Sequence, residues 1–140
     1  MTTVPAGDAA CGPNQQTALE AAFARVQPEP VTGQEWSGVP KAGNYSPCAD
    51  LSAILVTVVG ATGSSPSEAL LFHRGIYLGP ATPIAYGLTT LDAAASTSDT
   101  VVLTYRTGQS CTACGDGVVT RVRFHWDGTA VRILDPLPPG

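Results

Sequence analysis

The candidate reactive residues of this chain are four cysteines: Cys11, Cys48, Cys111 and Cys114. Four cysteines allow three pairings, and the one that we favour joins Cys11 to Cys48 and Cys111 to Cys114. The chain-entropy model gives the long first loop roughly 3–4 kcal/mol of stability, and the short second loop about half as much. Because disulfides persist in oxidising compartments, this interpretation predicts a protein located outside the cytoplasm.

Two other uses of the cysteines stay open. A four-cysteine zinc site normally combines two closely spaced pairs, whereas only Cys111 and Cys114 are close together here. A redox-active Cys-x-x-Cys pair needs a helix N-terminus that stabilises its thiolate, but glycines flank this pair and a strand-like run follows it. We therefore expect structural disulfides, no metal and no cofactor, with redox chemistry at Cys111 and Cys114 as the alternative.

A second candidate site lies on the last hairpin, which we expect to turn at Asp127-Gly128. With a two-residue turn, Arg132 on the return strand lies directly opposite Arg123. Like charges in opposed positions destabilise a sheet, so a basic face here indicates a site for an anion or an acidic partner. The alternative is a solvated face that nearby carboxylates neutralise. The members of this basic face are Arg121, Arg123, Arg132 and His125.

No catalytic motif accompanies the two histidines. His73 falls in an expected hairpin turn, and His125 lies on an exposed strand face. The chain has no Gly-x-Ser-x-Gly elbow, and Ser64-Ser65 lie in a loop without a strand–turn–helix frame. A nucleophilic triad needs a histidine beside a serine and a carboxylate, and nothing in the sequence indicates one. We expect a protein that is not an enzyme.

The composition excludes several classes of protein. The chain is 44% hydrophobic and only 13% charged, against a usual charged share of about 25%, so it is too apolar for disorder. A net charge of −4 disfavours a nucleic-acid binder, which would be basic. Lys41 is the only lysine, and no apolar run is long enough to span a membrane. The start of the chain pairs no basic stretch with an apolar one, so we expect any targeting segment to lie outside it.

The apolar pattern predicts one helix followed by strands. An apolar stripe with helical spacing runs from Leu19 to Val26, with Asn14 as its cap and Pro28 at its end. We therefore predict an α+β fold in which the N-terminal helix packs on one face of a disulfide-stapled antiparallel sheet of about five to six strands. Residues 1–10 are expected to be a flexible leader and residues 11–140 a single domain. The expected strands include Leu51–Val59, Ala69–Phe72, Ile76–Leu78, Val101–Arg106, Val118–Trp126 and Thr129–Leu134.

Several segments resemble the LppP/LprE lipoproteins of actinobacteria, from about Cys11 to Asp135. None of these segments is a catalytic signature. They are Ser46-Pro-Cys-Ala-Asp-Leu-Ser-Ala53, Gly60-Ala-Thr-Gly-Ser-Ser-Pro66, Leu70-Leu-Phe-His-Arg-Gly75, Tyr77-Leu-Gly-Pro-Ala-Thr-Pro83, Asp99-Thr-Val-Val-Leu-Thr-Tyr-Arg106 and Phe124-His-Trp-Asp-Gly128.

The resemblance implies secretion and attachment to the cell envelope through a lipidated cysteine at the mature N-terminus. Met1–Ala10 contains no Leu-x-Gly-Cys motif, so we interpret Cys11 as a disulfide partner and expect this chain to lack the anchor. The family supplies no catalytic residues. We expect a monomeric, non-catalytic binding or structural module with an envelope ligand or protein as its partner. It would bind no nucleic acid and meet the membrane only through its lipid.

Overall fold

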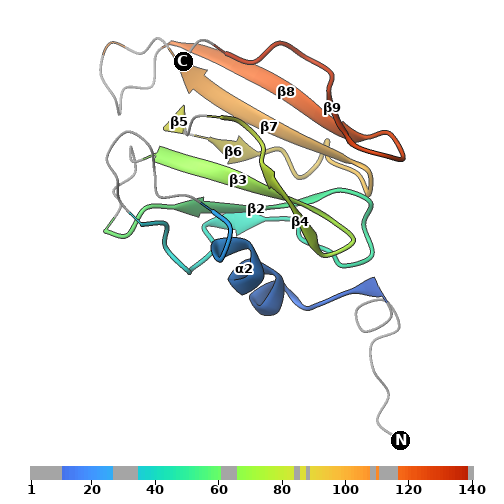
Figure 1. The fold of residues 1–140 in the computed structure, drawn as a ribbon. Helices are drawn as coiled ribbons and strands as arrows, with labels where there is room; N and C mark the ends of the chain where they lie inside the picture. The colour runs from blue at the N-terminus through green and yellow to red at the C-terminus, as the bar shows by residue number, and fades with distance from the viewer. Residues whose placement is uncertain are drawn as a thin grey trace, which may run out of the picture.

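Two antiparallel β-sheets stack face to face in the computed structural model, and helix α2 covers the outer side of the first sheet (Figure 1). The structure describes residues 11–26, 35–60, 66–83, 86–87, 89–107, 110 and 117–138, so the predicted leader lies outside it. The elements are α2 (Gln15–Phe23), β1 (Ala42–Gly43), β2 (Ser52–Thr57), β3 (Pro66–His73), β4 (Ile76–Pro80), β5 (Tyr86–Gly87), β6 (Thr90–Leu91), β7 (Thr100–Thr107), β8 (Val118–Trp126) and β9 (Val131–Ile133).

The first sheet has the strand order β1-β2-β3-β4, and β5 pairs with β3 beside β4. Strand β2 pairs with β3 in an unbroken register, from Ser52 opposite Phe72 to Thr57 opposite Ser67. All residues of β2 from Ser52 to Val56 are fully buried. A strand buried on both faces needs a protein layer on each side, as the apolar run Leu51–Val59 predicted.

The second sheet has the order β6-β7-β8-β9. Its longest pairing joins β7 to β8, from Thr100 opposite His125 to Thr107 opposite Val118. Alternate residues of β8 differ in burial: Val122 and Phe124 are fully buried, whereas their neighbours are partly or fully exposed. This sheet therefore has one apolar face, directed at the first sheet, and one face directed at solvent.

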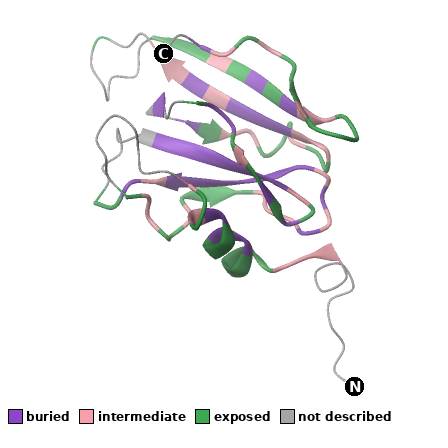
Figure 2. Ribbon diagram, in the orientation of Figure 1, coloured by how far each residue is buried: buried purple, intermediate pink, exposed green. Residues whose placement is uncertain are grey.

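Two apolar clusters hold the three layers together. Purple, buried segments run along β2 and β3 and alternate along β8 in Figure 2. Burying one large apolar side chain contributes about 1.5–3 kcal/mol. The cluster between the sheets consists of Leu51, Ala53, Leu55, Ala69, Leu71, Ala81, Tyr86, Val101, Leu103, Tyr105, Val122 and Phe124. The cluster beneath the helix consists of Ala18, Leu19, Ala22, Ile54, Val56, Leu70, Phe72 and Tyr77.

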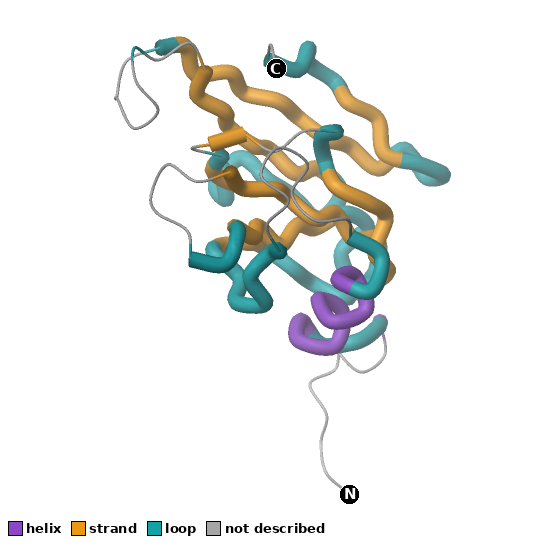
Figure 3. Tube along the Cα trace, turned by 60° about the vertical axis from the view of Figure 1, so that its left-hand side comes forward, coloured by secondary structure: helices purple, strands orange, loops and turns teal. Residues whose placement is uncertain are grey.

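The predicted α+β fold with a single sheet is wrong. The strands divide into two sheets, and Figure 3 shows the helix against the first of them, on the side away from the second. Helix α2 has only nine residues and covers one face of β2 and β3, so the other face needs a second apolar layer. Strands β7 and β8 supply that layer, because the apolar face of the second sheet packs against the first sheet. The alternation in the sequence shows which residues point inwards, but it does not show which sheet a strand joins.

Helix α2 begins at the predicted cap. The Asn14 side-chain oxygen accepts a hydrogen bond from the Thr17 backbone N–H at 2.9 Å, which satisfies a donor that the first turn leaves open. The helix ends at Phe23, before Pro28. Just beyond its end, the Arg25 guanidinium donates to the Tyr77 carbonyl at 3.0 Å and lies over the Tyr77 ring. No helix in the described part of the chain is long and apolar enough to cross a membrane.

The hairpin between β3 and β4 turns where the sequence predicted. His73 lies opposite Ile76, and the two turn residues between them, Arg74 and Gly75, have φ angles of 48° and 82°. Positive φ angles at both central positions are those of a type I′ turn, whose backbone twist matches the twist of the flanking strands.

The predicted register of the last hairpin is wrong by two residues. His125, and not Arg123, lies opposite Arg132. The Asp127 carboxylate accepts hydrogen bonds from the backbone N–H groups of Thr129 and Ala130, both at 2.9 Å. These bonds stabilise a longer loop, because an aspartate side chain can take the place of a backbone acceptor in a turn.

A disulfide joins Cys11 to Cys48, 37 positions apart in the chain, with Cα atoms 4.9 Å apart. This bond confirms the favoured pairing for these two cysteines. It fastens the segment before α2 to the segment before β2. Cys111 and Cys114 lie outside the described residues, so their predicted pairing stays a prediction.

Replacing both Cys11 and Cys48 with serine should lower the free energy of unfolding by about 3–4 kcal/mol, because the unfolded chain regains the freedom that the loop had removed. Urea unfolding followed by tryptophan fluorescence measures this loss. The control replaces Cys111 and Cys114 with serine, which keeps the long loop closed and should cost less. An unchanged urea midpoint in the Cys11 and Cys48 variant would contradict the prediction.

Candidate functional site

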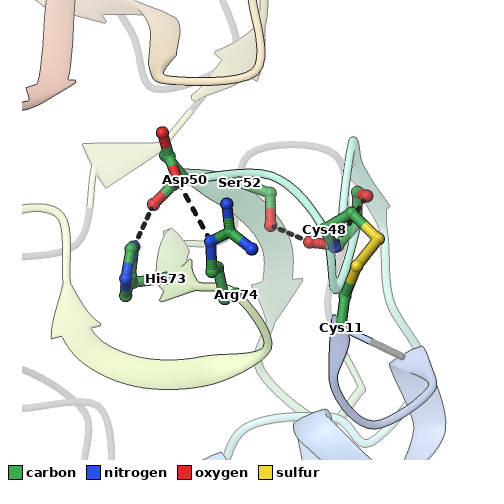
Figure 4. A network of polar contacts seen from close by, with 7 residues as sticks. Cys11, Cys48, Asp50, Ser52, His73 and Arg74 are labelled. Atoms are coloured by element: carbon green, nitrogen blue, oxygen red, sulfur yellow. Dashed lines mark hydrogen bonds and ion pairs between the residues drawn. A yellow bond between two sulfur atoms is a disulfide. The ribbon is translucent and has the colours of Figure 1, made fainter. Parts of the chain in front are cut away.

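A group of polar side chains lies beside the disulfide at one end of the first sheet (Figure 4). Asp50 pairs through its carboxylate with Arg74 Nε at 3.2 Å, and its carbonyl accepts a hydrogen bond from His73 Nδ1 at 2.7 Å. The Arg74 backbone N–H donates to the Ala49 carbonyl at 3.0 Å. These contacts join the segment around Cys48 to the β3–β4 turn, which indicates a structural role for this group.

The segment between the disulfide and the helix rests on the same turn. The Tyr45 hydroxyl donates to the Pro13 carbonyl at 2.6 Å. A Cβ atom at Gly75 would lie 2.7 Å from a Pro13 ring carbon, and one at Gly12 would lie 2.7 Å from the Arg74 carbonyl oxygen. Only glycine permits such close backbone approaches. The start of the helix is therefore held by the disulfide, by a hydrogen bond and by close packing.

Both histidines have structural contacts, and neither forms a catalytic triad with the residues that the structure describes. The His73 ring stacks on Trp126 with centroids 3.9 Å apart, which links the first sheet to the second. His125 Nδ1 lies 3.0 Å from the Thr100 hydroxyl and 3.9 Å from the Asp99 carboxylate. In a triad, the nucleophile and the carboxylate contact different ring nitrogens. The shared Nδ1 therefore excludes that arrangement for this group.

Each member of the predicted basic face has an acidic neighbour. Arg123 makes the most complete pair, because its Nε and Nη2 atoms donate to the two oxygens of Asp135 at 2.9 and 3.0 Å. This contact lowers the pKa of Asp135 and raises the pKa of Arg123. The arrangement favours a neutralised outer face over an anion site. The pairs are Arg121 with Asp92, Arg123 with Asp135, Arg132 with Asp127 and His125 with Asp99.

Glu68 is a buried acid that sequence reasoning missed. Only 6% of the residue is exposed, and its carboxylate accepts hydrogen bonds from the Ala69 backbone N–H at 3.0 Å and the Thr82 hydroxyl at 3.2 Å. Burial raises the pKa of Glu68 to about 8, because these neutral donors only partly replace the lost water. One signal was available in the sequence, since Glu68 directly precedes the apolar run of β3.

The hollows on the described surface include the following three. One of about 350 Å³ lies beside the end of α2, where Phe23 and Trp36 line it together with Glu35. A second, of about 220 Å³, is mainly apolar and lies between the edge strands β4 and β9. The third, of about 240 Å³, is lined by Lys41, Thr90, Thr104, Tyr105, Arg106 and Val119.

The third hollow is the only one of the three that two cationic side chains, Lys41 and Arg106, line among the described residues. The sequence marks Lys41 as the single lysine, but it does not show that Lys41 and Arg106 come together. The described residues contain no cluster of three or more histidine, cysteine, aspartate or glutamate side chains that could hold a metal ion.

The buried Glu68 should make the stability depend on pH. Below about pH 4.5 the carboxyl is neutral in both states, whereas from there to about pH 8 the unfolded chain ionises while the folded chain stays protonated. The free energy of unfolding should therefore fall as pH rises through this window, by up to about 1.4 kcal/mol per pH unit relative to Glu68→Gln. Urea unfolding of both proteins across the window measures the difference.

The control for this experiment is Glu20→Gln, on the exposed face of α2. It should keep the pH dependence of the parent protein, because it leaves Glu68 in place. A constant difference in stability between Glu68→Gln and the parent across the window would contradict a raised pKa at Glu68.

The ion pairs of the basic face should contribute modestly to stability. Arg123→Ser should lower the melting temperature by no more than a few degrees, because solvent screens an exposed pair. The same substitution should cost less in a protein that already carries Asp135→Asn, and comparing the four proteins by calorimetry isolates the pair. A higher melting temperature in Arg123→Ser would instead favour a face kept for binding at the expense of stability.

Comparison with known proteins supports the resemblance in the sequence. The family model of the LppP/LprE lipoproteins matches residues 43–129. A protein named "Putative lipoprotein LprE" from Mycobacterium leprae is 38% identical over 112 residues, which is 80% of this chain and 52% of that protein. Proteins of the same name from Mycobacterium bovis and Mycobacterium tuberculosis are 37% identical over 106 residues, 76% of this chain and 49% of theirs.

The chain thus spans about half the length of these curated relatives. No solved structure matches it. The family match begins within β1 and ends inside the β8–β9 loop, so it includes strands of both sheets. On these matches, the chain belongs to the LppP/LprE lipoprotein family.

Proposed function

We propose that this chain is the folded part of an envelope lipoprotein, held at the outer side of the cell membrane by a lipid anchor. Membership of a lipoprotein family supports the anchor. The Cys11–Cys48 disulfide is the observation that supports a location outside the cytoplasm, because such bonds persist in oxidising compartments and are rare in the cytosol.

The domain acts, in this proposal, by binding an envelope ligand or a partner protein as a monomer, without catalysis. His73 and His125 support this interpretation, because both are engaged in contacts with neighbouring residues that lack triad geometry. The hollow around Lys41 supports it further, since two cations line one surface depression of an acidic protein.

The disulfide and this hollow lie at opposite ends of the sheets. The Cys11 end adjoins the β3–β4 turn at Arg74, whereas Lys41 contacts Ser67 near the start of β3. Six residue steps of β3 separate Ser67 from His73, which corresponds to about 20 Å. An anchor on the N-terminal side of Cys11 would therefore hold the disulfide end nearer to the membrane and leave the hollow facing outwards.

Metabolic labelling tests the anchor. The complete gene is expressed in a mycobacterial host with an alkyne analogue of palmitate, and the protein is separated by detergent partitioning. We expect labelled protein in the detergent phase, with Cys11 and Cys48 resistant to alkylation until they are reduced. The matched control is the same gene without the region that precedes Cys11, which should be unlabelled. Unlabelled protein with free thiols from the complete gene would contradict the proposal.

A further inference from the structure

Lys41, the only lysine of the chain, differs from the ion-paired arginines in the kind of group that it contacts. Its ammonium donates to the Ser67 hydroxyl at 2.8 Å and to the Thr89 carbonyl at 3.4 Å. Both partners are neutral, and no described carboxylate lies within ion-pair distance of it. By contrast, Arg74, Arg121, Arg123 and Arg132 each have a carboxylate partner.

The surroundings of the Lys41 ammonium favour an anion. Although the residue as a whole is exposed, protein atoms remove part of the water from its charged end, and this burial lowers its pKa. A cation that loses water without gaining a counter-charge is destabilised. An anion bound beside Lys41 would supply that charge.

The other residues of the hollow suit the same kind of ligand. Arg106 brings a guanidinium, whose fork of N–H donors matches the oxygens of a phosphate. Thr90 and Thr104 face each other across β6 and β7, and their hydroxyls are hydrogen-bonded to one another. None of the described lining residues is acidic. The described lining therefore offers cations and hydroxyl groups, with no negative charge to repel an anion.

We infer that this hollow binds a phosphate group, with Lys41 as the central contact and Arg106, Thr90 and Thr104 around it. A phosphate monoester carries a charge of about −1.5 to −2 near pH 7, which gives the Lys41 ammonium the counter-charge that its described surroundings lack. A volume of about 240 Å³ is below the range of about 300–1,000 Å³ that is usual for drug-sized ligands. The hollow therefore suits one phosphate and the atoms next to it.

This inference rests on the binding role proposed above, but the two can fail separately. Lipid labelling examines the anchor and needs no ligand, whereas phosphate binding can be measured on this chain in solution. A negative labelling result would leave the hollow unaffected, and a hollow that binds nothing would leave the anchor unaffected.

The test is an NMR titration of the isotope-labelled chain with inorganic phosphate near pH 7 at constant ionic strength. We expect saturable shifts of the backbone amides of Thr90, Thr104 and Val119, which line the hollow. Lys41→Met should weaken phosphate binding at least about tenfold, equivalent to about 1.4 kcal/mol, whereas Lys41→Arg should retain most of it.

A second titration uses glycerol 3-phosphate. Tighter binding of glycerol 3-phosphate indicates the phosphate of a larger molecule, and equal binding indicates that free phosphate suffices; both support the site.

The matched control is Arg132→Met, which removes the same charge from the hairpin at the other end of the second sheet. It should bind phosphate as the parent protein does. The inference is overturned if the shifts fail to saturate, if sodium chloride of equal ionic strength produces them, or if Lys41→Met and Arg132→Met weaken binding equally. If Lys41→Met does not fold, the position of the shifts on the parent protein decides the question.

Discussion

Strand β2 leaves neither of its faces to water, and the rest of the domain follows from this constraint. Its residues from Ser52 to Val56 are fully buried, so a protein layer must cover each side of the first sheet. Helix α2 covers one side and the second sheet covers the other. Apolar burial of this kind is the dominant favourable contribution to folding. The three-layer order is thus the arrangement in which both faces of β2 are buried away from water.

The helix depends on this packing for its existence. It has nine residues, and isolated helices shorter than about 12–15 residues are marginal in water. Its start is held by the Cys11–Cys48 disulfide and by the close approach of Gly12 and Gly75 to neighbouring segments. These links join the helix to the same end of the first sheet as the β3–β4 turn. The outer layer therefore depends in part on a disulfide, a bond that persists in oxidising compartments.

Charge is scarce in this chain, and the structure uses it in distinct ways. The arginines of β8 and β9 lie on the outer face with carboxylates beside them, where solvent screens their interactions. Glu68 and Lys41 differ, because Glu68 is buried among neutral groups and Lys41 contacts only neutral groups among the described residues. Groups of this kind have the most to gain from a change in protonation or from a ligand. We therefore expect Glu68 to make folding sensitive to pH, and Lys41 to make one hollow attractive to an anion.

Several local features of this protein can be predicted from short stretches of its sequence. The cap at Asn14, the buried strand around Leu51–Val59, the alternation of Val118–Trp126 and the turn at Arg74-Gly75 all follow from side-chain chemistry over a few residues. The pairing of Cys11 with Cys48 was also predicted from the sequence. The family was predicted from short segments that resemble those of its members.

The division of the strands into two sheets could not be predicted in this way, because periodicity shows which side chains point inwards but not which residues they contact. The register of the last hairpin depended on hydrogen bonds from the loop to Asp127, which moved Arg132 from Arg123 to His125. The sequence also did not predict that Lys41 contacts Ser67 and lines a hollow with Arg106, because these residues lie far apart in the chain. Local structure depends on the chemistry of neighbouring residues, whereas a site assembled from distant strands forms only when the sheets pack together.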